Sequence, residues 1–144
     1  MPKNVMNEHL FQIDTDTTGT TPALEAIGAG ITNVAISNNE ELDQTKYLDG
    51  DGFGETDVIG AQTVLAFTGH RDYGDPAQDF IFGKMLSIGV SRRVPFEWTE
   101  PDGGKYSGTC TIANISGPGG DAGSKGEISF EIHFNKRPTY TAGV

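Results

Sequence analysis

The sequence has little of what disulfide-stapled, metal-binding or membrane proteins carry. Its 144 residues include a single cysteine, Cys110, so no internal disulfide can form, and no Cys/His cluster has metal-ligand spacing. The longest apolar runs, such as residues 64–67, are far shorter than the roughly 20 residues of a membrane helix. Residues 1–5 show no apolar stretch typical of a secretory signal. We therefore expect no metal, no cofactor and no membrane partner.

Basic residues are also scarce. Ten Lys and Arg stand against 20 Asp and Glu, which gives a formal net charge of -10. Such a chain should be repelled by nucleic acid phosphates and should not bind them specifically. Residues 1–57 hold eleven acidic residues and only two basic ones, Lys3 and Lys46, whereas the remainder is nearly balanced. The acidic part is either a solvated face or a set of arms and loops whose charge guides assembly.

Catalytic motifs are absent or incomplete. The stretch DGDGFG at residues 49–54 looks like a calcium loop, but its fifth and twelfth positions are Phe53 and Gly60. Only a weak calcium contact near residues 49–57 stays open as an alternative. The tripeptide at residues 70–72 has no ATP-binding loop to accompany it, and residues 123–125 have the wrong order for a phosphate loop. The chain is therefore predicted not to be an enzyme, which favours a structural or binding protein.

Period-2 alternation dominates the second half of the chain. Residues 127–135 alternate apolar and polar side chains without a break, and residues 92–100 alternate almost as cleanly. This pattern is typical of half-buried antiparallel strands with one polar face. The strands expected are residues 10–13, 31–37, 58–70, 92–100, 105–115 and 127–135, with turns at 101–104 and 117–123.

Two segments carry helix signals. Asp75 followed by Pro76 and Gln78 predicts an N-cap, a first-position proline and a capping box, with an apolar stripe reaching Ile88 before Gly89. Residues 22–27 could form one helical turn capped by Thr21.

The polar segments set the expected organisation of one domain over residues 1–144. They are an N-terminal arm of about residues 1–21, a long polar loop of about residues 38–57 and a C-terminal arm of about residues 136–144. A short hairpin around residues 43–48 is expected inside the loop. A connection of 20 residues within a compact domain is uncommon and usually functional or mobile.

From the third predicted strand onward, the order of features becomes specific. The motifs are TGHRDY at 68–73, DPAQDF at 75–80, FEWT at 96–99, TIANISGPGG at 111–120 and GEISFEIHFN at 126–135. Together they resemble a tail tube protein, also called major tail protein, of long-tailed bacteriophages. The resemblance is strongest over residues 58–140 and is general in the N-terminal third.

This resemblance implies a mainly β fold: an antiparallel β-sandwich or barrel with one flanking α-helix, similar to the type VI secretion tube protein. It implies a virion protein, assembled in the host bacterial cytoplasm, whose hexameric rings stack into a hollow tube. The tube would enclose a tape measure protein, meet tail terminator and tail-tip proteins at its ends, and carry DNA only in transit.

Two candidate surfaces follow. The strand period assigns Glu97, Glu127 and Glu131 to the lumen face, with ordinary solvent exposure as the alternative. The length, acidity and glycines of the long loop suggest that it contacts the next ring, with a loop of no role as the alternative. Its candidate contact residues are Glu41, Asp43, Lys46, Tyr47, Leu48, Asp49, Asp51 and Phe53, and the candidate partners are Arg92, Arg93, Lys105, Lys125, Lys136 and Arg137.

Two other classes of protein remain open. A secreted or surface carbohydrate-binding or adhesion module would also be acidic, Gly-rich and all-β, but should show a strip of exposed aromatics. An enzyme on a small β-barrel would need an acid–base constellation, which the sequence does not supply.

Overall fold

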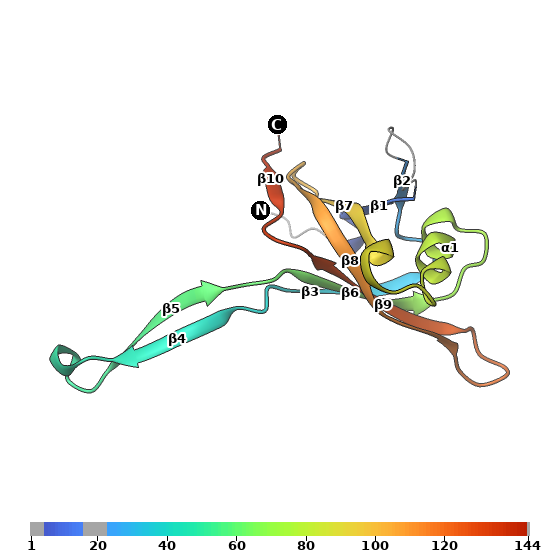
Figure 1. Cartoon of the computed structure of the whole chain (residues 1–144). Coiled ribbons are helices and arrows are strands. Elements are labelled where there is room, and N and C mark those ends of the chain that lie inside the picture. The colour runs from blue at the N-terminus through green and yellow to red at the C-terminus, as the bar shows by residue number, and fades with distance from the viewer. Residues whose placement is uncertain (1–4, 16–22, 144) are drawn as a thin grey trace.

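The computed structural model describes residues 5–15 and 23–143 (Figure 1). In this part of the chain, eight strands form one antiparallel sheet, two form a separate hairpin, and one α-helix flanks the sheet. The sheet order is β2-β1-β7-β8-β9-β6-β3, with β10 beside β8. The sheet strands are β1 (Leu10–Asp14), β2 (Leu24–Ala26), β3 (Ile31–Ser37), β6 (Val64–His70), β7 (Arg93–Thr99), β8 (Lys105–Gly119), β9 (Glu127–Phe134) and β10 (Thr139–Thr141). The other elements are β4 (Glu41–Lys46), β5 (Gly54–Gly60), α1 (Pro76–Gly83) and short 3-10 turns at Met6–Glu8, Leu48–Gly50 and Gly89–Arg92.

The apolar half of the alternating pattern makes the core. Along β9, burial alternates at every residue: Ile128, Phe130, Ile132 and Phe134 are buried, and the residues between them are not. The predicted strands 10–13, 31–37, 92–100 and 127–135 are confirmed to within one or two residues at each end. The predicted fold class, mainly antiparallel β with one flanking helix, is also confirmed.

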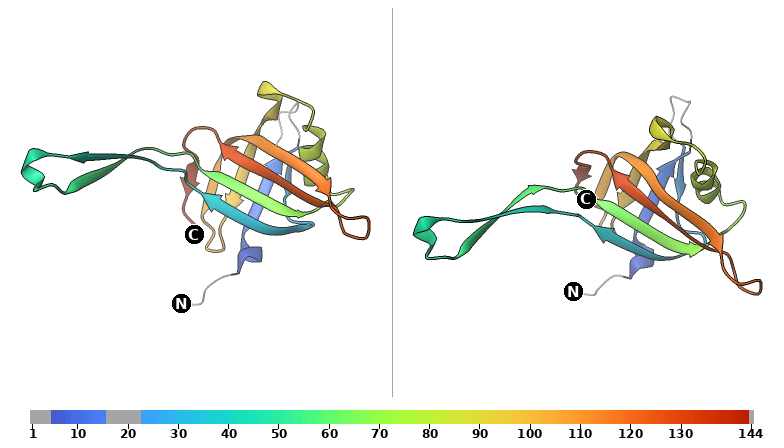
Figure 2. Two further views of the ribbon diagram at one scale, coloured as in Figure 1. Left: turned by 90° about the horizontal axis from the view of Figure 1, so that it is seen from below. Right: turned by 60° about the horizontal axis from the view of Figure 1, so that its bottom comes forward.

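The sheet curls into two layers. Figure 2 shows β3, β6, β9 and β8 side by side in one layer, with β7 and β1 behind them. Phe11 of β1 meets Phe67 of β6 edge to face at 5.2 Å between ring centroids, although three strands separate them in the sheet. The core therefore fills the space inside the curl, and the outward faces of the two layers point in opposite directions.

Helix α1 lies against β2 and β8 and closes one side of the curl. Its start is as predicted: the Asp75 side chain accepts a hydrogen bond from the Gln78 backbone N–H, and Pro76 is the first helical residue. Its end differs, because the helix stops at Gly83 rather than near Ile88. Glycine disfavours the helical state, and Arg92 holds the next turns in another shape by donating to the carbonyls of Met85 and Ser87.

Other predicted segments need correction. The predicted strand 58–70 is two strands, because residues 61–63 break it and β5 and β6 belong to different sheets. The predicted helical turn at residues 22–27 is instead strand β2, which pairs with β1; Thr21 and Pro22 lie outside the described residues.

The loops and arms also differ from expectation. Strand β8 continues to Gly119 and takes in part of the predicted loop 117–123. In the C-terminal arm, β10 pairs with β8. Of the predicted N-terminal arm, residues 1–4 and 16–21 lie outside the described residues, and β1 is part of the sheet. The long polar loop is a β-hairpin, described next.

Candidate assembly surfaces

The segment predicted as a polar loop is a β-hairpin that projects from the body, and we call residues 38–62 the arm. Strands β4 and β5 pair over six positions, and the turn Leu48–Gly50 forms the tip. Figure 1 shows the arm continuing beyond β3 and β6, away from the side of the body where α1 lies. The hairpin expected within residues 43–48 is therefore larger than predicted: these residues supply mainly its first strand, and the second strand is β5, Gly54–Gly60.

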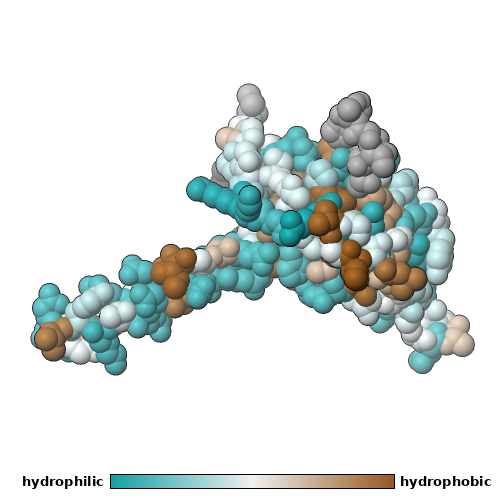
Figure 3. Space-filling model, in the orientation of Figure 1, coloured by the Kyte–Doolittle hydropathy of each residue, from teal (hydrophilic) through white to brown (hydrophobic). Residues whose placement is uncertain are grey.

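All eight candidate contact residues lie on this arm and all are exposed. Glu41, Asp43 and Lys46 are on β4, and the remaining five surround the tip. Leu48 is fully exposed, at 106% of its reference area, and Phe53 is 78% exposed. Figure 3 shows hydrophobic atoms both at the tip and midway along the arm, where Leu42, Val58 and Ile59 are exposed.

The arm is strongly acidic, and within the described residues its carboxylates form no ion pair with a Lys, Arg or His side chain. It has seven Asp and Glu residues and one Lys. Asp43 lies directly opposite Asp57 in the β4–β5 ladder, an arrangement of like charges that destabilises a hairpin. Of the ion pairs found in the described residues, none includes an arm carboxylate. An isolated two-stranded hairpin is at best marginally stable in water, so this arm is suited to being supported by a partner.

The outward face of the layer β3-β6-β9-β8 is covered by small and polar side chains. Strand register puts Ala66 beside Glu131, Thr68 beside Ser129 and His70 beside Glu127 on this face. Its members on the four strands are Ala35, Ser37, Val64, Ala66, Thr68, His70, Thr111, Ala113, Glu127, Ser129, Glu131 and His133. A smooth polar surface of this kind suits contact with water better than burial against a partner.

The three candidate lumen carboxylates divide between the two layers. Glu127 and Glu131 are on β9, on the polar face just described. Glu97 is on β7, in the other layer, where its carboxylate lies 3.9 Å from the Lys105 ammonium. Because the sheet curls between β7 and β9, Glu97 points to a different side of the molecule from Glu127 and Glu131.

Glu131 is held by two neighbours on the polar face. Its Oε1 atom lies 2.8 Å from His133 Nε2 and accepts a hydrogen bond of 2.8 Å from Asn114 Nδ2. The bond to His133, followed by the bond to Asn114, lowers the pKa of the Glu131 carboxyl from its ordinary value of 4.5. Glu131 is therefore ionised at neutral pH, with its charge partly taken up by its neighbours.

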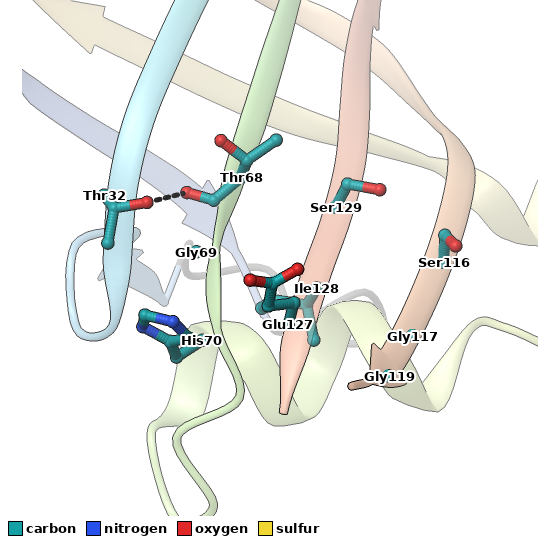
Figure 4. Close-up of a pocket in the computed structure, with 10 residues that line it drawn as sticks. All are labelled: Thr32, Thr68, Gly69, His70, Ser116, Gly117, Gly119, Glu127, Ile128 and Ser129. Atoms are coloured by element: carbon teal, nitrogen blue, oxygen red, sulfur yellow. Dashed lines mark hydrogen bonds between the residues drawn. The ribbon is translucent and has the colours of Figure 1, made fainter. Parts of the chain in front are cut away.

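A hollow lies at the end of the polar face farthest from the arm. Figure 4 shows Glu127 and His70 at its rim, with Thr32 donating a hydrogen bond of 3.3 Å to the Thr68 carbonyl. Gly117 allows β8 to approach β9 closely there, because its φ is +100° and a side chain at this position would strike the Glu127 carbonyl oxygen. The lining also includes Ser116, Ser129 and Ile128, and among the described residues no hydrogen bond joins a lining hydroxyl to the His70 ring.

Sequence reasoning missed one surface, and we call residues 84–93 the shoulder. Leu86, Ile88 and Val90 are 95%, 88% and 76% exposed, beside α1 on the body. The predicted apolar stripe of the helix reached Ile88, but the helix ends before it. Arg92 fixes the shoulder by donating to the carbonyls of Met85, Ser87 and Ile112 at 2.9–3.2 Å.

The candidate basic partners differ in whether they already have a partner within the subunit. Arg92 is occupied by those three carbonyls and Lys105 lies near Glu97. Arg93 is exposed on the shoulder. Lys136 and Arg137 are exposed and line a hollow at the base of the arm, and Lys125 is exposed in the β8–β9 loop.

The chemical side chains that the sequence analysis tested do not converge. No group of three or more His, Cys, Asp or Glu in the described ranges is arranged to hold a metal ion. Cys110 is a core residue, as predicted, and burial raises the pKa of its thiol to about 12. Trp98 is partly buried, stacks on Tyr106 and donates a hydrogen bond of 3.0 Å to His9 Nδ1. No helix in residues 5–15 and 23–143 is long and apolar enough to cross a membrane.

Comparisons with known proteins reveal similarity at the level of the fold. No protein-family model and no curated protein matches the sequence. Among solved structures, a chain from the tail of an empty gene transfer agent particle with C6 symmetry matches at a TM-score of 0.78 and 18% identity, over 97% of this chain and 100% of that chain. A chain from the virion of a native gene transfer agent matches at a TM-score of 0.76 and 17% identity, with 97% and 100% covered. The tube-terminating cap of the anti-feeding prophage matches at 0.61 and 13% identity, with 99% and 93% covered.

These matches identify the class of fold. The curled two-layer sheet with a flanking helix is shared with chains of phage-like tails and of a tube cap. The chain therefore has the tail-tube fold that the sequence resemblance implies.

Proposed function

We propose that this chain is the structural subunit of a phage-like tail tube, forming hexameric rings that stack into a hollow conduit. The observation that carries the proposal is the match over nearly the whole chain to a tail with C6 symmetry. The molecule's own surfaces support it, since a smooth polar sheet face and a projecting arm are what a lumen and a stacking contact require.

The polar face of β3-β6-β9-β8 is the proposed lumen. Adjacent subunits would join these layers edge to edge into a continuous inner barrel, which also protects the exposed edge strand β3. Glu127 and Glu131 then face the lumen and discourage DNA from binding in transit. Glu97, on the opposite layer, is assigned to the outside.

The arm is the proposed contact between rings. Its exposed apolar tip and the mutual repulsion of its carboxylates are unfavourable in a free subunit, and a complementary surface with positive charge would relieve both. By extension from the resemblance, a tape measure protein occupies the lumen during assembly in the host cytoplasm. Tail terminator and tail-tip proteins close the ends, the tube has no catalytic activity, and it belongs to the virion tail.

The test is assembly of the purified protein, followed by negative-stain electron microscopy and sedimentation. We expect hollow tubes with six-fold rings from the wild type. Replacing residues 41–60 with a Gly-Ser turn should give folded subunits that remain unassembled, because the arm contributes no side chain to the core. Monodisperse wild-type monomers under all conditions would refute the tube, and normal tubes from the shortened chain would remove the arm from the ring contact.

A further inference from the structure

The shoulder is an exposed apolar surface in an unusual electrostatic setting. Leu86, Ile88 and Val90 are alternate residues that the free subunit leaves almost entirely in water. Residues 80–96 contain three basic residues and no acidic one, in a chain with twice as many acidic as basic residues. The shoulder therefore combines apolar contact area with local positive charge.

The tip of the arm has the opposite combination. Leu48 and Phe53 are exposed apolar side chains, and Asp49 and Asp51 stand between them. The arm as a whole carries seven carboxylates and one lysine. Apolar groups on both surfaces and opposite charges around them are the two forms of complementarity that a stable interface uses.

Within one subunit the two surfaces cannot meet. The arm extends away from the body, whereas the shoulder lies beside α1 on the other side (Figures 1 and 2). We therefore propose that the tip of the arm docks on the shoulder of a second copy of this chain, with Leu48 packed against Ile88 and Val90 and with Asp49 near Arg93.

This docking explains why association would be directional. A contact between two different patches of the same chain is heterologous, and it continues indefinitely unless rotation closes it into a ring. Arms that carry the same strong charge repel one another, so arm-to-arm pairing is disfavoured. The inference rests on the proposed function, because it names the receiving surface of the ring contact.

Disulfide trapping in assembled tubes tests the docking. Leu48→Cys is combined in turn with Leu86→Cys, Ile88→Cys or Val90→Cys, and tubes are oxidised with copper(II)–phenanthroline. A disulfide requires Cα atoms within roughly 7 Å, and Cys110 stays out of the reaction because it is buried with a raised pKa. We expect at least one pair to give a ladder of covalent multimers on non-reducing gels, while each single-cysteine variant gives dimers at most.

The control pair is Leu48→Cys with Tyr140→Cys. Tyr140 lines the hollow at the base of the arm that also contains Lys136 and Arg137, so it tests the alternative basic surface. Tubes that yield a ladder only with the control pair, or with no pair, would overturn shoulder docking and leave the tube itself intact. Failure of the wild type to form tubes would instead refute the proposed function.

A charge comparison gives an independent readout at the same position. Ile88→Glu and Ile88→Lys remove the same apolar side chain from an exposed site, so both should fold. We expect Ile88→Glu to raise the critical concentration for assembly at least tenfold more than Ile88→Lys, since only the carboxylate repels the acidic arm. Equal critical concentrations for the two variants would overturn the docking.

Discussion

Replacing the buried glutamine Gln78 with methionine should destabilise the subunit more than any surface change considered above. The Gln78 side chain is fully buried and joins three segments of the chain. Its amide nitrogen donates to the carbonyls of Ala29 and His70 at 2.7 and 3.1 Å. Its amide oxygen accepts from the Asp72 backbone N–H at 2.8 Å and from Arg71 at 3.3 Å.

The magnitude follows from what the substitution leaves behind. Methionine has the same length but removes all four hydrogen bonds, and each buried group left without a partner costs about 1–3 kcal/mol. Asp72 and Ala29 are exposed residues whose backbone groups can turn to water. The loss therefore comes mainly from the half-buried His70 carbonyl, which loses this donor, and from the net contribution of about 0.5–1.5 kcal/mol of each hydrogen bond removed. Added hydrophobic burial offsets about 1 kcal/mol. We expect a net loss of about 2–4 kcal/mol, a large share of the roughly 5–15 kcal/mol that stabilises a domain.

The assay is urea and thermal unfolding at one fixed protein concentration, because assembly would add to the apparent stability. For a chain of this size, the expected loss lowers the melting temperature by about 10 °C. The matched control is Gln44→Met on the exposed arm, which should change stability by less than about 0.5 kcal/mol. A Gln78→Met variant within about 1 kcal/mol of the wild type would refute the reasoning that this amide network holds α1 to the sheet.

Two further predictions concern the carboxylates of the sheet. Replacing Glu127 and Glu131 together with Lys should leave folding and tube formation intact but reduce infectivity more at low salt than at high salt, because lumen cations hold DNA phosphates, whereas Glu97→Lys on the other layer should not; wild-type infectivity with normal tubes would remove Glu127 and Glu131 from the lumen. Glu131→Gln should make the free energy of unfolding depend less on pH in the acid range. The folded-state pKa of Glu131 lies below its ordinary value of 4.5, so the ionised carboxylate stabilises the fold above that pH, and this contribution is lost as the pH falls through the lower folded pKa. Urea midpoints measured from pH 6 to pH 3 that run parallel in the wild type and the variant would contradict the second prediction.

The structure was predicted best from the sequence where residues close together in the chain determine the local conformation and burial. The alternation over residues 127–135 shows both that β9 is a strand and which of its faces is buried, because a period of 2 maps directly onto the two faces of a sheet. The N-cap at Asp75 was predictable for the same reason, since the residues that form it are three positions apart.

The sequence failed where distant segments decide the conformation. Residues 24–26 are extended because they pair with β1, which a local helix signal cannot reveal. The break at residues 61–63 is fixed by Gln62, whose N–H donates to the Asn38 carbonyl and whose side chain donates to the Phe134 carbonyl. The shoulder could not be predicted from the sequence, because the Arg92 side chain donates to the carbonyls of Met85 and Ser87 in place of helical backbone N–H groups. The apolar residues that a longer helix would have placed on one face are therefore exposed.

The distribution of charge changes how the acidity of the chain should be understood. The net charge of -10 first suggests a conduit whose wall repels DNA, yet the proposed lumen face is mostly Ala, Ser and Thr, and Glu131 there is bonded to His133. Seven of the 20 carboxylates are on the arm, and the rest of the chain has 13 acidic against nine basic residues. Most of the excess charge thus lies where neighbouring subunits would meet rather than where DNA would pass. A wall of small, nearly neutral polar groups lets DNA slide because it offers few contacts of either sign, whereas the acidic arm makes the choice of partner depend on charge.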